Sequence, residues 1–478
     1  MLSAPPPFFF FGGPLKLVRL SLTTGIFWAN TSLCFTVQTC LASRQIQEIN
    51  PVLLAMDPST FIDPYLTPPD RLVLDNLLLD SQSTPEKPKS SGGTPDVPLD
   101  ADATVSQLEA FNDPRHADFV PTIFFTWDLK DIKLPPLLDA WLLQPYIKAA
   151  RSIVRVDTDV VMLTHLLLYF TTSVPSAIYL FRNFHWLHGV LHWIMQSYYV
   201  GTYTLMMHQH IHMGGILKKR NWWLFDTIFP YITDPLMGHT WNSYFYHHVK
   251  HHHVEGNGPD DLSSTIRYQR DSLADFACYV GRFYLFIWLE LPTYFLRKGK
   301  TLLGLKAAFW ELSSYLMMYL LWNYVSWRAT LFVFVLPFLQ LRVGLMVGNW
   351  GQHAFVDETD PNSDFRSSIT LIDVASNRFC YNDGYHTSHH LNPRRHWRDH
   401  PLAFLRQKDR YASEHALVFR NIDYIMITVR LMRKDYDHLA RCLVPMGDQI
   451  GMTHAELAAM LRRKTRRFSE EEIKRKFA

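Results

Sequence analysis

Four stretches of the chain carry almost no charged side chains over the length of a membrane-spanning helix. They are residues 160–181, 186–207, 307–325 and 329–347. The first two contain no Asp, Glu, Lys or Arg, and the last two contain one charged residue each, Glu311 and Arg342. Because about 20 apolar residues in a helix cross a hydrocarbon core of about 30 Å, this pattern predicts four transmembrane helices. Short connections rich in aromatic residues separate the members of each pair, which predicts two tight helical hairpins.

Basic residues mark one end of the predicted hairpins. They are Lys148, Arg151 and Arg155 before the first stretch, Lys218, Lys219 and Arg220 after the second, and Arg297, Lys298 and Lys300 before the third. The positive-inside rule places these groups in the cytosol. Residues 278–296 are also apolar, but Arg282 and Glu290 interrupt them, so we interpret this stretch as an interfacial helix. A fifth span is the alternative, and it would reverse the sidedness of everything that follows.

The ends of the chain differ in composition from the predicted membrane domain, residues 103–420. Residues 1–55 contain basic residues and many Ser and Thr, but no acidic residue before Glu48. Two interpretations stay open, a transit peptide or an artefactual extension before a start at Met56. Residues 56–102 are interpreted as a disordered linker, because Pro, Ser, Gly and charges are frequent in their second half. Residues 421–478 are predicted to form a soluble helical tail.

Composition excludes several classes of function. The chain of 478 residues has a net charge of +3, which is too close to neutral to indicate nucleic-acid binding. Its five cysteines are scattered and include no CxxC pair, so neither a disulfide framework nor a thiolate metal site is indicated. Histidine, with 23 residues, is the enriched type of metal ligand.

Histidines with the spacing of one helical face occur at four places. They are His208 with His212, then His248, His251 and His252 within a run of five histidines, then His353 one turn after Asn349, and finally His386, His389 and His390. Residues three and four apart lie on the same face of a helix. Two crossings between His253 and His353 bring all four places to the cytosolic face, where the side chains can form one site.

The number of histidines indicates the kind of metal centre. Nine imidazoles exceed the four ligands of a structural zinc ion. They fit two ions with five or six ligands each and open positions for O2 or water, and imidazole suits iron among other metals. Two redox-active irons at the mouth of a membrane domain indicate the oxidation of a lipid-like substrate.

The order of these motifs resembles the integral-membrane fatty acid desaturase family, a di-iron superfamily with three histidine boxes. The boxes are HxxxH (His208, His212), HxxHH (His248, His251, His252) and HxxHH (His386, His389, His390), and the resemblance covers about residues 140–420. It implies an all-α membrane protein with four transmembrane helices in two hairpins and a cytosolic helical cap that carries the boxes. In acyl-CoA desaturases of this kind, the histidine that corresponds to His353 is a ninth ligand, and the asparagine that corresponds to Asn349 reaches an iron through water.

The resemblance also implies an activity and partners. The protein is expected to use two Fe ions and O2 to introduce a double bond into the acyl chain of an acyl-CoA or a membrane lipid. The sequence has no His-Pro-Gly-Gly haem motif, so electrons are expected from a separate donor of the cytochrome b5 or ferredoxin type. The expected location is the endoplasmic reticulum membrane, with the active site facing the cytosol, and an organelle membrane is the alternative.

Several residues around the boxes leave alternatives open. The second box can also be read as His247-xxx-His251-His252 or as His248-xxx-His252-His253. The first box has Gln209 where many desaturases have an acidic residue, and it contains an extra histidine, His210. Asp260 and Asp261, in the turn after the second box, are either hydrogen-bond partners of ligand histidines or residues that cap a helix.

Two other functions are compatible with the same histidines. A hydroxylase with the same irons differs only in whether oxygen returns to the carbon atom. A membrane protein that binds zinc without catalysis is the alternative from another class, and metal analysis separates it from the two oxygenases.

Overall fold

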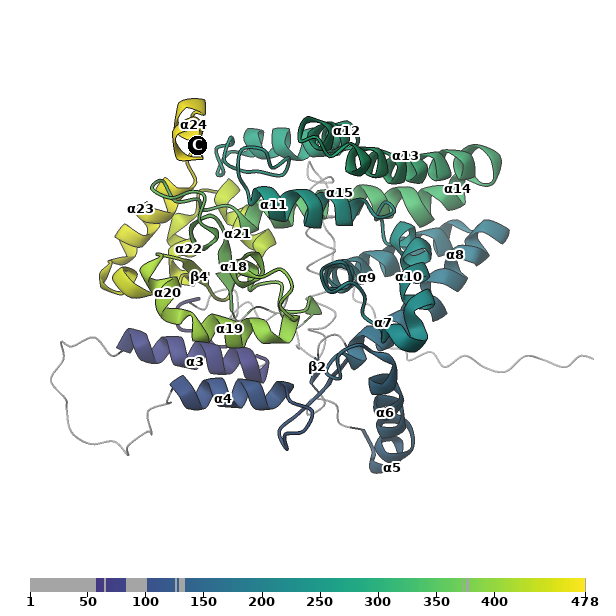
Figure 1. Ribbon diagram of the computed structural model, residues 1–478, viewed down its shortest axis with the longest axis horizontal. Coiled ribbons are helices and arrows are strands. Elements are labelled where there is room, and N and C mark those ends of the chain that lie inside the picture. Colours follow the sequence, from purple (N-terminus) through teal and green to yellow (C-terminus); the bar gives the residue numbers. More distant parts are fainter. Residues whose placement is uncertain are drawn as a thin grey trace, which may run out of the picture.

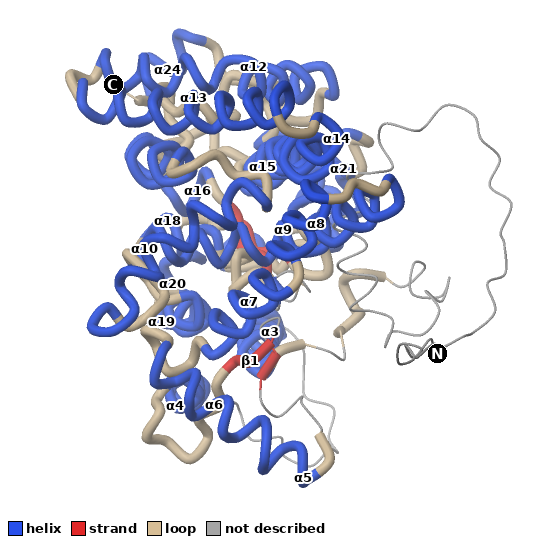
Figure 2. Tube along the Cα trace, turned by 90° about the vertical axis from the view of Figure 1, so that its right-hand side faces the viewer, coloured by secondary structure: helices blue, strands red, loops and turns tan. Residues whose placement is uncertain are grey.

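The computed structural model describes residues 57–63, 66–82, 101–124, 127–128, 134–372, 374, 377 and 379–477. Within this part the chain is mostly helical, as predicted, and Figure 2 shows only short strands among the helices. Strand β1 (Thr122–Phe124) pairs antiparallel with β2 (Trp127–Asp128), and β3 (Ile369–Leu371) pairs parallel with β4 (Leu417–Phe419). The predicted transit peptide or extension, residues 1–55, lies outside the described residues.

Each of the four apolar stretches is helical. The helices are α7 (Val160–Thr171), α8 (Ser173–Arg182), α9 (Trp186–Met213), α13 (Thr301–Tyr324), α14 (Trp327–Thr330), the π-helix η4 (Leu331–Val335) and α15 (Leu336–Gln352). Within the described chain, two continuous runs are long and apolar enough to cross a membrane, Val160–Arg182 and Trp327–Gln352. The other two stretches, in α9 and α13, do not reach that level of apolarity, so the four spans stay a prediction.

The outer faces of these helices are apolar. On α9, the side chains of Leu187, Leu191 and Ile194 are exposed, and on α13 those of Phe309 and Leu316 are exposed. So many exposed large apolar side chains on long helices are unusual for a protein that contacts only water. The surface therefore suggests a membrane protein whose long helices face lipid.

The one charge in each apolar stretch of the second pair has its partner in the other stretch. Glu311 of α13 forms an ion pair with Arg342 of α15, and both side chains are buried. Thr240 Oγ1 also donates to Glu311 at 2.6 Å, and Tyr315 donates its hydroxyl to the same carboxylate. The single charges of the two apolar stretches therefore neutralise each other in one hydrogen-bonded ion pair.

Helix α12 (Leu273–Arg297) is the segment that we interpreted as interfacial. It is amphipathic, because Phe276, Tyr279 and Ile287 are buried while Leu285 and Leu289 are exposed. Its two interrupting charges form a surface ion pair, with Arg282 Nε 3.0 Å from Glu290 Oε1. Its place at a membrane interface stays a prediction.

The remaining helices form a cap, residues 354–477, beside the long helices (Figure 1). Its elements are α16 (Asp364–Ser367), α18 (His386–Leu391), the 3-10 helix η5 (Trp397–Asp399), α19 (His400–Arg406), α20 (Lys408–Ser413), α21 (Tyr424–Met432), α22 (Tyr436–Cys442), the 3-10 helix η6 (Gly447–Gly451), α23 (His454–Lys464) and α24 (Glu470–Lys476). Strands β3 and β4 lie in its core, where Ile369 and Phe419 are fully buried. The predicted helical tail is thus helical, but it belongs to this core through Leu457 and Leu461.

Four further helices precede or connect these groups. They are α5 (Pro136–Leu138), the π-helix η2 (Asp139–Leu143), α6 (Gln144–Ile153) and α10 (Lys219–Leu236). Exposed apolar side chains crowd η2 and α10, among them Trp141, Trp223 and Leu224. These segments extend the apolar surface of the long helices.

The disordered linker predicted for residues 56–102 is wrong in part. Pro68–Gln82 forms helix α3, which packs with α4 (Ala101–Asn112) against the cap. Val73, Leu74 and Leu77 of α3 are buried in that contact. The apolar surface that covers them comes from residues some 300 positions later, so local composition did not reveal it. Residues 83–100 of the predicted linker lie outside the described residues.

Replacing Arg342 by Met is expected to destabilise the protein strongly, because Glu311 would stay buried without its counter-charge. Breaking a buried ion pair costs about 3–5 kcal/mol, whereas an exposed pair contributes about 0–1 kcal/mol. We expect Arg342→Met to lower the free energy of unfolding in detergent by several times more than Arg282→Met, which breaks the exposed pair of α12. Equal effects of the two substitutions would contradict this account of the Glu311–Arg342 pair.

Candidate metal centre

A π-helix determines which histidines of the second box face the other boxes. Residues Phe245–His252 form π-helix η3, which continues into the short helix α11 (His253–Glu255). The backbone N–H of His253 bonds to the carbonyl of His248, five residues earlier. In a π-helix, residues five apart therefore lie one above the other, which is not so in an α-helix. As a result His248, His252 and His253 face the centre, and His247 and His251 face away from it.

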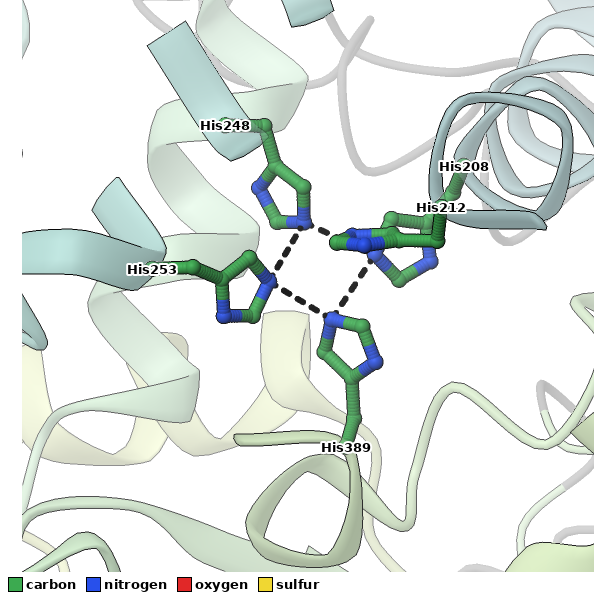
Figure 3. Close-up of side chains that lie close together, drawn as sticks. All are labelled: His208, His212, His248, His253 and His389. Atoms are coloured by element: carbon green, nitrogen blue, oxygen red, sulfur yellow. Dashed lines mark hydrogen bonds between the residues drawn. The ribbon is translucent and has the colours of Figure 1, made fainter. Parts of the chain in front are cut away.

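Five histidines form the first group. They are His208 and His212 at the end of α9, His248 and His253 of the second box, and His389 of α18. Four of their Nε2 atoms form a closed ring, which Figure 3 shows. Around this ring the distances are 2.8 Å (His208–His248), 3.0 Å (His248–His253), 2.8 Å (His253–His389) and 3.0 Å (His389–His208).

The spacing of this ring fits a metal ion with more than four ligands. Nitrogen donors that bind one ion at about 2.1 Å lie about 3.0 Å apart at right angles, and about 3.4 Å apart in a tetrahedron. The observed 2.8–3.0 Å matches the right-angle arrangement. The fifth histidine of the group, His212, lies beside these four imidazoles. Its buried Nε2 atom has no hydrogen-bond partner among the described residues. The residues present therefore fit a five- or six-coordinate ion.

Four histidines form the second group, and all of them are buried. They are His252, His353 at the end of α15, and His386 and His390 of α18. His386 Nε2 lies 3.2 Å from His353 Nε2 and 3.1 Å from His390 Nε2. The two groups together hold nine histidines from all three boxes and from the segment after the last long helix.

Oxygen atoms around the second group orient its rings. His252 Nδ1 lies 2.8 Å from Asp261 Oδ2, and His353 Nδ1 lies 2.8 Å from the carbonyl of Ser367. His390 Nδ1 lies 3.4 Å from an oxygen of Asp364. An oxygen acceptor at Nδ1 places the ring proton there and leaves the lone pair of Nε2 directed at the other rings. This is the tautomer that binds a metal through Nε2.

Burial keeps these imidazoles uncharged. Burial and the neighbouring imidazoles lower the pKa of His208, His386 and His389 well below the ordinary value, and they lower the pKa of His212 to about 4. Burial alone would raise the pKa of Asp261, but attraction to His252 and their hydrogen bond lower it below the usual range. A neutral imidazole is the form that coordinates metal, so His208, His212, His386 and His389 are in their binding form at neutral pH.

The structure brings together eight of the nine predicted ligand histidines. The exception is His251, which lies outside both groups, and His253 takes the place predicted for it. Of the three registers of the second box, the geometry favours His248-xxx-His252-His253. The i→i+5 hydrogen bond of η3 is the physical reason, because an α-helical spacing would select different residues.

The other predicted site residues have separate roles. Asp261 is the hydrogen-bond partner of His252, whereas Asp260 forms an ion pair with Lys298 at 2.7 Å. The extra histidine of the first box, His210, contacts the carbonyl of Asp226 at 3.0 Å, away from both groups. Asn349 donates to the carbonyl of Ser263 and, at 2.6 Å, to the hydroxyl of Tyr279.

Sequence reasoning missed several polar residues near the histidines. Asp364 and Ser367, which hold rings of the second group, carry no signal in the sequence that links them to the boxes. Asp383 is another such residue and is partly buried; desolvation raises its pKa to about 7, and Gln352 donates to it at 3.3 Å. Its position three residues before His386 was the only available signal.

An apolar cavity of about 710 Å³ opens onto both histidine groups. Its wall contains His208, His248, His252 and His386. The rest of the wall is mostly apolar and includes Val200 and Leu205 of α9, Phe283 of α12, Leu345 of α15, and Val429 and Met432 of α21. The cavity thus connects the candidate metal centre with the space between the long helices and α21.

The comparison with protein families agrees with this site. The profile of the family described as Fatty acid desaturase matches residues 158–421, a region that contains all nine grouped histidines. The chain belongs to the fatty acid desaturase family. Membership of this family implies that the protein is an oxidoreductase and that its substrate is a fatty acyl chain. Comparisons with curated proteins and with solved structures found no match.

Acid is expected to destabilise the metal-free protein between pH 6.5 and pH 4. The unfolded chain binds protons at its histidines below about pH 6.5, whereas folded His212 stays neutral until about pH 4. As the pH is lowered through this range, the free energy of unfolding therefore decreases by about 1.4 kcal/mol per pH unit for each such histidine. Thermal unfolding of chelator-treated protein in detergent at pH 7 and pH 5 measures the effect, and His212→Gln should reduce it. Equal stability of the metal-free protein at the two pH values would contradict the prediction.

Proposed function

We propose that the protein is a membrane-bound, O2-dependent di-iron desaturase that introduces a double bond into a fatty acyl chain. The observation that carries this proposal is the convergence of nine histidines, six buried and three partly buried, in two groups that both contribute to the wall of an apolar cavity. Each part has a role in such a reaction, because the imidazoles can hold metal and the cavity can hold a hydrocarbon chain. Membership of the fatty acid desaturase family supports the same reaction.

The chain supplies ligands for two irons. His208, His212, His248, His253 and His389 would hold one ion, and His252, His353, His386 and His390 would hold the other. When bound, iron supplies the O2-dependent chemistry that removes hydrogen from an unactivated C–H bond. Asn349, which lines the cavity beside the second group, remains the candidate for a contact with that ion through water.

The cavity supports an acyl substrate. Its apolar walls bind methylene groups and exclude water from the histidine end, where a reactive oxidant would otherwise be quenched. Arg433 of the cap also lines the cavity and provides a positive charge for an anionic head group. Both an acyl-CoA and a phospholipid carry such a group, so the substrate class is an acyl chain on an anionic carrier.

A membrane location fits the surface of the protein. Two apolar runs are long enough to span a bilayer, and exposed apolar side chains continue over α9 and α13. We propose four spans, with the cap and the histidines in the cytosol and the endoplasmic reticulum as the membrane. The mutual neutralisation of Glu311 and Arg342 supports placing α13 and α15 in the bilayer.

A second hollow reaches the first histidine group from another direction. Its lining includes His212 and His253, together with Arg155, Lys250 and Arg394, and among its described residues none is acidic. The three cations come from segments far apart in the chain and surround an approach to the metal ligands that does not use the acyl cavity. We propose that an acidic redox protein, of the cytochrome b5 or ferredoxin type, docks here and delivers electrons.

The test of the proposed reaction is lipid analysis of cells that express the protein. Wild-type protein should produce an acyl chain two mass units lighter than its precursor, and His386→Ala should abolish it, because it removes a ligand of the second group. His188→Ala is the matched control, since His188 lies about 30 Å from His208 along α9. A product 16 mass units heavier would identify a hydroxylase, and purified protein with zinc but no iron and no product would refute both oxygenases.

Reversal of charge at the second hollow is expected to weaken the binding of the electron donor. Lys250→Glu and Arg394→Glu should each raise the KM for an acidic donor severalfold and lessen its dependence on salt, with little change in the KM for the acyl substrate. Lys474→Glu on α24, outside this lining, is the control. Steady-state turnover with reduced donor measures both constants. An unchanged KM for the donor in both variants would exclude this docking surface.

A further inference from the structure

The π-helix leaves two histidines of the second box outside both groups, and they meet a carboxylate. His247, His251 and Asp261 each offer one ligand atom, and these atoms lie within 4.8 Å of one another. His251 and Asp261 are fully buried, and the Nε2 atom of His247 is buried although its ring is partly exposed. The proposed desaturase reaction makes no use of His247 or His251.

Two nitrogen atoms of this cluster lack partners. His247 Nε2 and His251 Nδ1 are buried and form no hydrogen bond within the part of the chain that the structure describes. A buried polar atom without a partner costs about 1–3 kcal/mol, and here two such atoms lie beside the same carboxylate. This arrangement is costly in a protein that binds nothing there, and it is the expected one if both atoms are ligands.

The contacts of His251 permit this role. Its Nε2 atom accepts a hydrogen bond from the amide N–H of Leu262 at 3.1 Å, and it also lies 3.2 Å from the carbonyl of Asp260. Metal binding through Nδ1 requires the ring proton on Nε2, where it is donated to the carbonyl of Asp260 in place of the hydrogen bond accepted from Leu262. The lone pair of Nδ1 is then available beside Asp261. A carbonyl partner of this kind is typical for a histidine that binds metal through its other nitrogen.

The distances allow one ion to be shared. His251 Nδ1 lies 3.9 Å from Asp261 Oδ1. Two donors that bind one ion at about 2.1 Å lie between about 3.0 Å apart, at right angles, and about 4.2 Å apart, on opposite sides. Asp261 Oδ1 also accepts hydrogen bonds from the amide and the hydroxyl of Ser263, at 2.8 and 2.7 Å, which hold the carboxylate in place.

We propose that His247, His251 and Asp261 bind a third metal ion, a divalent first-row transition metal such as Zn²⁺ or Fe²⁺. Two imidazoles and one carboxylate are a donor set for these metals, and three protein ligands leave positions open for water. His247 also lines the acyl cavity, so the open side of the ion faces that space.

The third ion has a positioning role. It joins π-helix η3, which carries both histidines, to the turn that carries Asp261. The same carboxylate holds His252 of the second group through its other oxygen, at 2.8 Å. The ion thereby fixes the orientation of one ligand of the two-ion centre without itself belonging to that centre.

Metal counting on purified full-length protein tests this proposal. After loading with Zn²⁺ and dialysis, elemental analysis should find three ions per wild-type chain and two in both His247→Gln and His251→Gln. His210→Gln is the matched control, because His210 is also an extra histidine of a box but lies outside every group, and this variant should keep three ions. Two ions retained in the variants show that the nine grouped histidines are still folded around their sites.

Three results would overturn the proposal. They are two ions in the wild-type protein, three ions in both variants, or a loss of more than one ion in a variant that is still folded. The last result would assign His247 and His251 to the two-ion centre itself. A titration of the wild-type protein with Co²⁺, followed by visible absorption, counts the binding steps without any substitution and decides the matter if a variant does not fold. Failure here leaves the desaturase proposal intact, since that proposal is tested by its lipid product.

Discussion

Nine imidazole rings can share one buried space only while they carry no charge. Each additional proton would bring a positive ring within a few ångströms of several others, in surroundings with little water to screen it. Burial lowers the pKa of rings such as His208 and His389, so the protein tolerates the crowding. Oxygen atoms of Asp261, Asp364 and Ser367 then fix the rings of the second group from outside.

This crowding requires a rigid frame, because the histidines come from four segments far apart in the chain. Buried hydrogen bonds connect those segments. Arg270, in the loop after the second box, donates to the carbonyl of Ala354 and to that of Lys464, each at 3.0 Å. Trp350 of α15 donates to the carbonyl of Arg270 at 3.1 Å. The C-terminal helices thus hold the second box and the last long helix in one arrangement.

Spacing along the chain predicted most of the histidines that the structure groups together, and its limits have a physical cause. His208 with His212, and the third box, lie on regular helical turns, so four-residue spacing identified them. The second box could not be assigned in this way, because five histidines in seven positions satisfy every register. Only the backbone hydrogen bonds of η3 distinguish His253 from His251. Partners such as Asp364 depend on long-range folding, and no local pattern marks them.

The same reasoning explains where the fold was predicted and where it was not. Long apolar runs such as residues 160–181 and 329–347 predict helices directly, because each must satisfy its own backbone. Helix α3 has a weak pattern by comparison, and its apolar face is stable only against the cap. The positions of Glu311 and Arg342 were visible in the sequence, but their pairing became apparent only from the packing of α13 on α15.

Helix α3 also changes what counts as the functional unit. Its Asp70 accepts a hydrogen bond at 2.9 Å from the hydroxyl of Tyr385, the residue directly before His386 of the third box. The family match begins only at residue 158, yet a segment nearly ninety positions earlier helps to hold the helix that carries the third histidine box. The region that matches the family and the region that folds as one unit therefore begin at different residues. A fragment that began at residue 158 would lack the hydrogen bond from Tyr385 to Asp70.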